Sequence, residues 1–377
     1  MGLRHSHNAL LGLILVVLAG CVEPISFEVP QASSQLVVEG YIDNHFGPHV
    51  VHLSRASNIE ADTIIQNPVS GASITLYEDR VKVADYVEVT PGFYIIDEGL
   101  FSGSVGHQYH IEIRTSDGHT YRSLQDELTE VGSINNIHTQ YEQRSVLTQT
   151  GETNASVMKV LVDSKAGNGE QPLIRWRYSG YFYVTTYPMF FWRDEPPYTP
   201  YKDPWPCSGY IVVEGPPGSG GLLEQVGECT CCECWGRLYE NAPTLSTEEL
   251  VEEGNFANVL VGEVPVSPMV FSNRIMVKVE QMSLSRQAFD FFNIIRSQKE
   301  NGQSIFQPAF GELKGNIVSD RSDDLVSGIF YATAINTQVI YIDSTDVPVN
   351  IPEETYITYP CTALIDDTSY DKPELWE

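Results

Sequence analysis

Six cysteines carry the most distinctive chemistry of the chain beyond residue 21, and they are Cys207, Cys229, Cys231, Cys232, Cys234 and Cys361. Four of them form a C-x-C-C-x-C motif within six positions. An even number of thiols in an exported protein predicts up to three disulfides, with fifteen possible pairings. We expect the adjacent Cys231 and Cys232 to bond to separate partners, for which Cys207 and Cys361 are candidates.

The same motif is compatible with two other kinds of chemistry. Thiolates bind Cu(I), zinc and iron–sulfur clusters, and neighbouring thiols can serve redox reactions. The spacing differs from the paired C-x-x-C of a structural zinc site, and an exported protein favours oxidised cysteines. We therefore expect disulfides, with no metal and no cofactor.

A seventh cysteine closes the sequence Leu18-Ala19-Gly20-Cys21, which matches the lipobox of bacterial lipoproteins. Residues 1–20 resemble a secretory signal peptide, with a basic start and an apolar core of eleven residues from Ala9 to Ala19. Such a core is well short of the roughly 20 residues that span a bilayer. We expect acylation of Cys21 and attachment to membrane lipid through its acyl chains. The alternatives are an ordinary cleaved leader, with Cys21 there by chance, and a short anchor helix.

Motifs for catalysis are missing from the sequence. It contains no His-Glu-x-x-His, no Gly-x-Ser-x-Gly and no Gly-x-Gly-x-x-Gly after a strand. Two histidine pairs, His49 with His52 and His107 with His110, are each spaced three apart. In a strand this spacing sends the two rings to opposite faces, which disfavours a shared metal. We expect a protein that is not an enzyme.

Aromatic residues are dense between residues 173 and 205, and the candidate ligand contacts among them are Trp192, Tyr198 and Trp205. Exposed rings of this kind are suited to stacking against a sugar or a peptide. The alternative is packing of the rings among prolines and within strands, which aromatic residues prefer.

The charge balance excludes one class of partner. The chain has 50 acidic residues against 22 lysines and arginines, a formal net charge of −28. Because a surface this acidic repels phosphate backbones, we exclude nucleic-acid binding.

A period of two dominates residues 36–128. Leu36, Val38 and Ile42 alternate with a second set of residues that includes Val37 and Glu39, and similar patterns recur over residues 72–76 and 109–113. Turn signals separate these segments, including Ser116-Asp117-Gly118. We predict a small immunoglobulin-like or transthyretin-like β-sandwich over residues 36–128, joined to Cys21 by a tether over residues 21–35.

A second β-rich domain is predicted over residues 129–377. One strand places Ile275, Val277 and Val279 inward and Glu280 outward. One prominent helix over residues 285–300 begins at Ser285 and carries an apolar stripe. Strands follow at 326–333 and 337–342, and residues 201–240 form a cysteine-rich loop. The predicted fold class is therefore mainly β, with one helix in its second domain.

The N-terminal segment resembles the carboxypeptidase-regulatory type of sandwich through Pro68-Val69-Ser70-Gly71-Ala72, Pro91-Gly92-Phe93-Tyr94 and the Ser-Asp-Gly hairpin. The whole chain resembles a family of Bacteroidetes outer-membrane lipoproteins known only as a domain of unknown function. The matching segments are 36–40, Cys234-Trp235, 289–292, 315–317 and 328–330.

Members of that family are commonly encoded beside TonB-dependent receptors. The resemblance implies a lipid-anchored outer-membrane protein that faces the cell exterior and partners a TonB-dependent β-barrel, as an accessory or ligand-receiving subunit. The alternative is a stand-alone adhesion lipoprotein that binds a glycan or a peptide.

Overall fold

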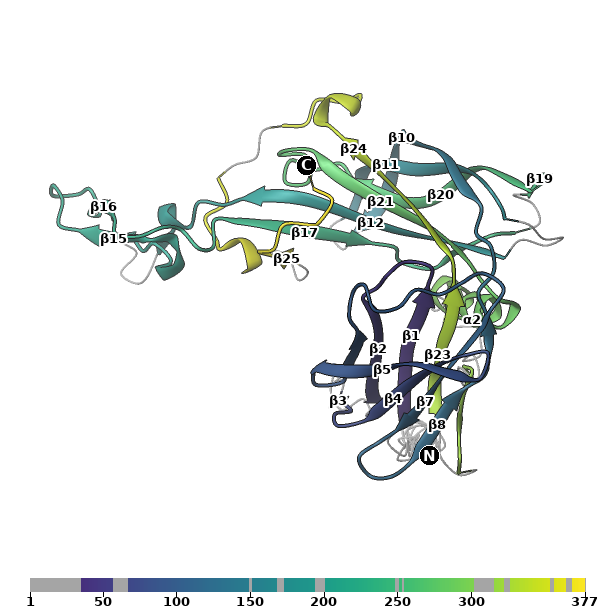
Figure 1. Ribbon diagram of the computed structural model, residues 1–377. Helices are drawn as coiled ribbons and strands as arrows, with labels where there is room; N and C mark the ends of the chain where they lie inside the picture. Colours follow the sequence, from purple (N-terminus) through teal and green to yellow (C-terminus); the bar gives the residue numbers. More distant parts are fainter. Residues whose placement is uncertain are drawn as a thin grey trace, which may run out of the picture.

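The computed structural model is mainly β and contains two packed β-structures joined by several crossing segments (Figure 1). The residues it describes are 35–56, 67–148, 151–167, 173–193, 201–247, 251–252, 254–301, 315–321, 326–352, 356–363 and 368–376. The predicted signal peptide, most of the tether, Cys21 and Tyr198 lie outside these residues.

One continuous hydrogen-bonded sheet curls into the first sandwich. Its path is β22 (Ile317–Ser319), β8 (Thr120–Ser123), β7 (Gln108–Arg114), β4 (Ser73–Glu78), β5 (Val81–Thr90), β6 (Phe93–Ile96), β2 (His49–Ala56), β1 (Gln35–Asp43) and β23 (Val326–Thr333), with β3 (Asn67–Pro68) on β2 and β9 (Asp126–Glu127) on β7. The long strand β5 pairs with β4 along its first half and with β6 along its second, so it belongs to both layers.

The alternation in the sequence explains the sandwich core. Leu36, Val38 and Ile42 on β1 are at most 1% exposed, and Tyr109, Ile111 and Ile113 on β7 are fully buried. These residues face one another between the layers, whereas Glu39 of β1 is exposed and Glu112 of β7 is partly exposed. The strands predicted over these segments are confirmed.

Strands from beyond residue 300 complete this sandwich. β23 pairs in parallel with β1 over the register Leu36↔Val326 to Asp43↔Thr333, and β22 pairs with β8. Phe330 of β23 is fully buried in the sandwich core. The sandwich therefore extends beyond the 36–128 range that sequence periodicity alone suggested.

Two further sheets face each other in the second part. One sheet runs β10 (Ser133–Thr148), β11 (Gly151–Lys165), β20 (Asn255–Pro265) and β19 (Val251–Glu252). The other runs β24 (Ile335–Ile342), β21 (Ile275–Ser283), β12 (Ile174–Thr185), β17 (Glu233–Tyr239) and β25 (Thr368–Ser369), with β18 (Thr244–Leu245) on β12. Trp176, Tyr178 and Phe182 of β12 are buried against Phe256 and the valines of β11 and β20.

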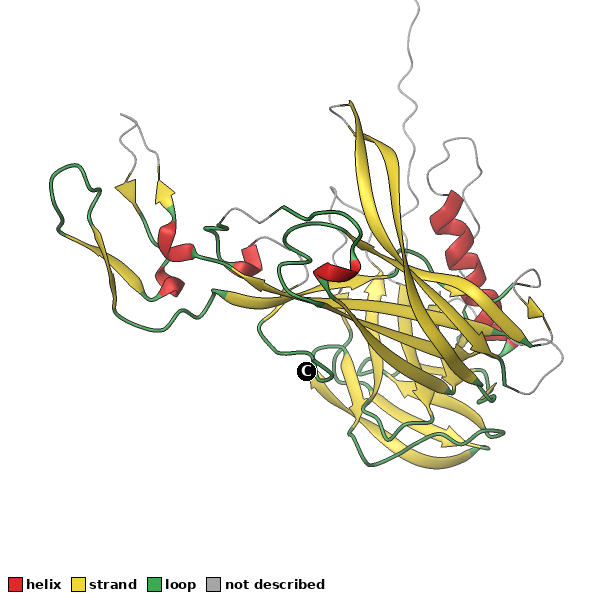
Figure 2. Ribbon diagram, turned by 90° about the horizontal axis from the view of Figure 1, so that it is seen from above, coloured by secondary structure: helices red, strands yellow, loops and turns green. Residues whose placement is uncertain are grey.

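The helix α2 (Arg286–Asn301) covers the seam between the two parts, on the opposite side of the molecule from the projecting hairpin β15–β16 (Figure 2). Ser285 accepts a hydrogen bond from the Ala288 backbone, which confirms the predicted cap. Ala288, Phe291 and Phe292 of the predicted stripe pack against Ile329 and Tyr331 of β23. β23 is thus covered on one face by the sandwich core and on the other by the helix.

A single run of chain passes from one part into the other. β23 lies in the first sandwich, and β24 begins two residues later in the second part. Ser283 of β21 holds the crossing point, because its backbone N–H donates to the Ala334 carbonyl and its Oγ accepts from the Ala334 N–H, each at 3.0 Å. At this crossing the two parts are therefore joined by consecutive strands that hydrogen bonds hold in place.

Candidate functional site

A long excursion leaves the second part between two paired strands. β12 and β17 form an antiparallel pair that ends at Thr185↔Glu233. The intervening chain projects from the body as an arm, which we define as residues 186–193 and 201–232 (Figure 1). Within it are β13 (Trp192–Arg193), β14 (Tyr201–Lys202), β15 (Tyr210–Val213), β16 (Leu222–Gln225) and the 3-10 turns η1 (Pro188–Phe190) and η2 (Pro206–Ser208).

Three disulfides hold the base of the arm. Cys207 pairs with Cys231, Cys229 with Cys232, and Cys234 with Cys361, with Cα–Cα distances of 5.7, 5.7 and 6.0 Å. Cys231 and Cys232 bond to different partners, as expected from the sequence, and Cys207 is one of them. Cys361, the other candidate partner, bonds instead to Cys234, so that part of the prediction is wrong. The third bridge fastens β17 to η5 (Cys361–Ala363), and the Cys361 N–H donates to the Cys231 carbonyl at 3.0 Å.

The two described tryptophans of the predicted contact set have different environments. Trp205 is half-buried at the base of the arm, where its ring lies 5.6 Å from Phe191 and 6.2 Å from Tyr359. Trp192 is 46% exposed, and the Lys202 ammonium lies 5.8 Å from its ring centroid. Among the described residues no ring contact joins them, so they do not form one stacking platform.

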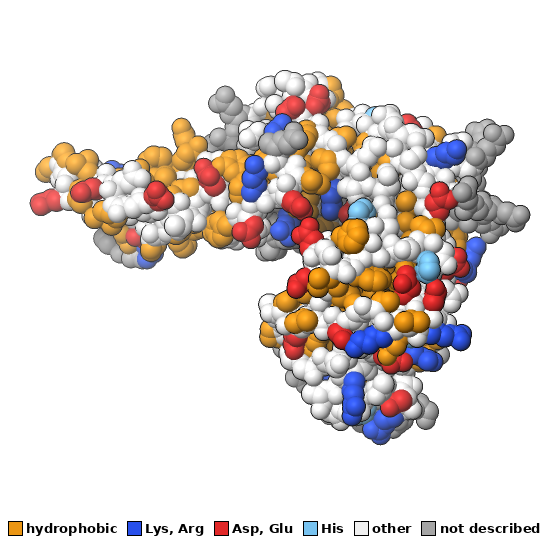
Figure 3. All heavy atoms as spheres, in the orientation of Figure 1, with side chains coloured by type: hydrophobic (Ala, Val, Ile, Leu, Met, Phe, Trp, Pro, Cys, Tyr) orange, Lys and Arg blue, Asp and Glu red, His pale blue; other side chains and the backbone are white. Residues whose placement is uncertain are grey.

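The outer part of the arm presents apolar side chains to solvent (Figure 3). Ile211 and Val212 on β15 are 45% and 39% exposed, Leu222 on β16 is 49% exposed, and Val226 is 60% exposed. The hairpin β15–β16 pairs only with itself among the described strands. From residue 204 to residue 232 the sequence has three glutamates and no lysine or arginine. The arm therefore offers an apolar strand pair with acidic flanks.

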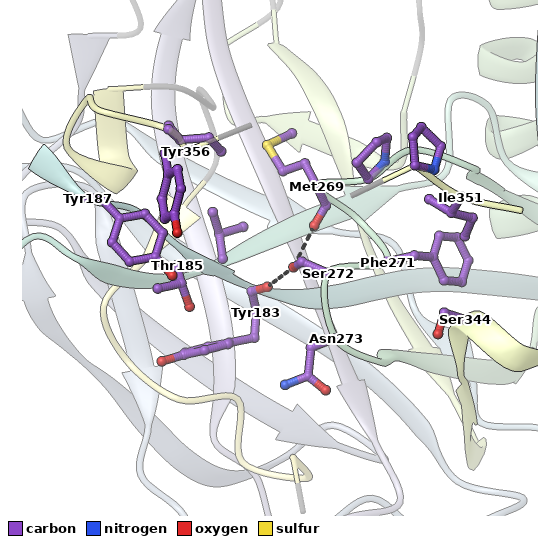
Figure 4. Close-up of a pocket in the computed structure, with 14 residues that line it drawn as sticks. Tyr183, Thr185, Tyr187, Met269, Phe271, Ser272, Asn273, Ser344, Ile351 and Tyr356 are labelled. Carbon is purple, nitrogen blue, oxygen red and sulfur yellow. Dashed lines mark hydrogen bonds between the residues drawn. The ribbon is translucent and has the colours of Figure 1, made fainter. Parts of the chain in front are cut away.

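A pocket of about 530 Å³ lies at the root of the arm (Figure 4). The lining residues come from three places: 183–187 at and just after the end of β12, the loop 268–273 before β21, and the described residues within 344–352 and 356–357. Tyr187 and Tyr356 stand together on one side, and Phe271, Ile351 and Ser344 lie on the other. Ser272 ties the loop to the strand through hydrogen bonds to the Tyr183 and Met269 carbonyls.

Hydrogen bonds and one raised pKa define the chemistry of the pocket walls. The Tyr187 N–H donates to the Ile357 carbonyl at 2.7 Å, and the Thr186 N–H donates to Cys232 at the same distance. Burial, and then the hydrogen bond with Glu233, raises the pKa of Tyr183 to about 12, so its hydroxyl is neutral at physiological pH. None of the described residues that line the pocket is acidic or basic.

A buried ionic network lies beneath the seam between the two parts. Glu280, predicted to face outward, is only 8% exposed, and this part of the prediction is wrong. Its carboxylate accepts hydrogen bonds from Arg177 at 2.6 Å and Lys278 at 3.0 Å, and Arg177 also donates to the Tyr41 hydroxyl of β1 at 3.2 Å. Burial raises the pKa of Glu280, but the hydrogen bond and charge of Arg177 outweigh it and lower that pKa overall.

His49 and His52 of β2 are separated as their spacing predicts, whereas His107 precedes β7, which holds His110. His49 is 2% exposed and contacts the Phe101 carbonyl at 3.0 Å, whereas His52 stacks on Phe93. No group of three or more histidine, cysteine or acidic side chains is placed for a metal within the described ranges. No helix among the described residues is long and apolar enough to cross a membrane.

The pocket was missed by sequence reasoning. Tyr356 and Ile357 lie in a segment without periodicity, and Tyr183 stands out only as one of many aromatic residues in its stretch. Nothing in the sequence singles out Tyr187. The single usable signal was Cys361, whose bond to Cys234 brings this segment to the root of the arm.

Comparison with known proteins gives one match. Residues 22–338 match a protein family described as a domain of unknown function (DUF4249). No curated protein and no solved structure shows a significant match to the chain.

Proposed function

We propose a function from the premise that this chain belongs to the DUF4249 family: it is a non-enzymatic lipoprotein of the outer membrane, anchored through Cys21 and facing the cell exterior. In this proposal it serves as an accessory or ligand-receiving subunit of a TonB-dependent uptake system. The lipobox supports the anchor, and the arm supports the partner.

The observation that carries the proposal is the apolar outer part of the arm. The side chains of Ile211, Leu222 and Val226 are exposed to solvent. Two disulfides within residues 207–232 hold the base of the hairpin that carries them. Apolar side chains gathered on a projecting element mark a protein contact surface, because a lone protein gains nothing by exposing them. Fixing the hairpin in advance reduces the entropy lost on docking.

The charge of the arm favours a protein over the lipid surface. Glu214, Glu224 and Glu228 flank the apolar side chains without a compensating cation on the same stretch. Anionic head groups would repel this surface. A protein groove with an apolar floor and basic rim matches it, and a surface loop of a β-barrel can supply such a groove.

Affinity purification of the full-length lipoprotein in mild detergent, followed by mass spectrometry, tests the proposal. We expect a TonB-dependent barrel in stoichiometric amount. Ile211→Glu combined with Leu222→Glu should remove the barrel from the complex. Val81→Glu combined with Val87→Glu is the matched control, since both valines are exposed on β5, far from the arm.

Isolation of the lipoprotein alone from its native membrane would overturn the proposed partnership. A barrel retained equally by the arm variant and the control variant would reject the arm as the contact. Release of Cys21-derived peptides without acyl chains, read by mass spectrometry, would reject the anchor.

A further inference from the structure

We infer that the pocket between Tyr183, Tyr187 and Tyr356 binds a neutral carbohydrate. This inference names the ligand class for the ligand-receiving role and rests on that proposed function. It depends on the pocket at the root of the arm, and not on the apolar hairpin that carries the proposed partnership.

The described residues that line the pocket are uncharged, in a protein with a formal net charge of −28. They number fourteen, and none of these fourteen is Asp, Glu, Lys, Arg or His. An ionic ligand entering this space would lose its hydration without gaining a counter-charge. The pocket therefore selects for neutral molecules, and its volume of about 530 Å³ falls in the range of small-molecule sites.

Tyrosine rings provide the apolar walls. Tyr187 and Tyr356 meet edge to face, with centroids 4.9 Å apart and planes at 78° (Figure 4). This arrangement fixes Tyr187, while Tyr356 keeps 73% of its surface exposed. A fixed aromatic ring next to a solvent-exposed one can stack against the C–H face of a sugar. Such stacking needs an apolar ring with polar groups at its edge, which tyrosine provides.

Hydroxyl and amide groups supply the polar contacts. Thr185, Ser344 and Asn273 line the pocket together with the tyrosine hydroxyls. Asn273 accepts a hydrogen bond from the Arg274 N–H at 2.8 Å through Oδ1, and its NH2 group carries two further donors. Groups that both donate and accept match sugar hydroxyls, which do the same.

An extended peptide fits this pocket less well. Strand addition needs free backbone N–H groups at an edge. At this end of β12 the Thr186 and Tyr187 N–H groups already donate to Cys232 and Ile357. A peptide would therefore bind only through side chains, and its charged termini would find no partner in the lining.

Binding to the full-length lipoprotein in detergent tests the inference. The probes are neutral tetrasaccharides of glucose, mannose, galactose and xylose, with a tetra-uronic acid and a neutral capped tetrapeptide as comparators. Titration calorimetry should detect at least one neutral tetrasaccharide, bound at least tenfold more tightly than either comparator. Tyr356→Ala should weaken that binding at least tenfold.

Matched variants separate binding from folding. Tyr370→Ala removes a tyrosine that is 50% exposed and does not line the pocket, so affinity should be unchanged. Asn273→Ala should weaken binding with an unaltered melting temperature. No binding of any neutral tetrasaccharide, binding untouched by Tyr356→Ala and Asn273→Ala, or preference for either comparator would overturn the inference.

The two proposals fail separately. A barrel that co-purifies with a lipoprotein unable to bind sugar removes the carbohydrate inference and leaves the partnership. Sugar binding by a lipoprotein that purifies alone removes the partnership and supports the stand-alone adhesion alternative.

Discussion

Gly328 and Val38 lie directly opposite each other on the parallel pair β23 and β1, so closely that a Cβ atom at position 328 would come 1.9 Å from the Val38 carbonyl oxygen. The backbone of Gly328 also has φ +99°, a value that residues other than glycine rarely adopt. β23 thus pairs with β1 at a position where only glycine fits.

Gly328→Ala should therefore destabilise the protein by more than about 2 kcal/mol, because steric overlap adds to an unfavourable backbone conformation. Denaturant unfolding gives the change in free energy. Gly118→Ala is the control: its φ is +90°, but nothing lies within 4 Å of the added atom. Equal effects of the two substitutions would contradict the close approach of β23 to β1.

A fragment of residues 35–131 should not fold alone. It retains the periodic strands β1 to β9 but lacks Ile317, Phe330 and Ala332, which belong to the same core. Amide hydrogen exchange should show little protection in this fragment and strong protection of β1 in the whole protein. A protected β1 in the fragment would show that β22 and β23 are dispensable.

Glu280→Gln should destabilise the protein by about 2 kcal/mol, because the half-buried Arg177 would lose its counter-charge at a buried site. Thermal or denaturant unfolding measures the loss. Glu263→Gln is the control, since Glu263 pairs with Arg144 on the surface at 2.6 and 3.0 Å and should contribute less than about 1 kcal/mol. Similar losses would contradict a special role for the buried network.

Asp126 should make stability fall as pH rises. Burial raises its pKa to about 6, although the Ser285 side chain and the Ala332 N–H, at 2.8 Å, favour the charged form. Since the folded pKa exceeds the unfolded value, the folded state binds the proton more tightly, and this stabilisation is lost between about pH 4 and pH 6. Asp126→Asn should be more stable than the parent by up to about 3 kcal/mol at pH 8.

At pH 4 the same substitution should have little effect, because the parent carboxyl is then protonated. The difference in unfolding free energy between parent and Asp126→Asn, measured across pH 4–8, isolates this one group. A difference that is constant with pH would contradict the raised pKa.

Removal of the disulfides should affect stability in a fixed order. Sequence separations of 127, 24 and 3 predict losses of about 5, 3 and 2 kcal/mol on a chain-entropy basis for the Cys234–Cys361, Cys207–Cys231 and Cys229–Cys232 bonds. Paired Cys→Ala variants and thermal unfolding test this order. A larger loss from Cys229–Cys232 than from Cys234–Cys361 would contradict it.

Local patterns in the sequence predicted the strands, the helix and the helix cap, because each depends on residues close together in the chain. The alternation around Val38 and Ile111 correctly predicted strands with one buried face. The apolar stripe from Ala288 to Phe292 correctly predicted the helix and the side of it that is buried. The capping role of Ser285 followed from its position before the stripe. Each of these depends on residues within one turn or one strand.

Features that depend on distant segments were not predictable in this way. The Glu280 side chain was expected to face solvent because alternation in β21 suggested one solvent-exposed face. Met276 and Met282 lie on the same face as Glu280 and are buried as well. Of the proposed contact residues, Trp205 packs into the base of the arm, and the tyrosine pocket joins three stretches that share no motif. Contacts between segments that are far apart in the chain leave no local pattern in a single sequence.

The position of β1 bears on how the molecule carries mechanical load. β1 lies between β2, which runs antiparallel to it, and β23, which runs parallel. A pull applied at Gln35, where the proposed membrane tether joins the fold, acts along the strand axis. The hydrogen bonds to both neighbours would then be loaded in shear and would have to break together. Tension between the membrane and a partner on the arm would thus reach the seam through β23 and β24 before it could open the sandwich.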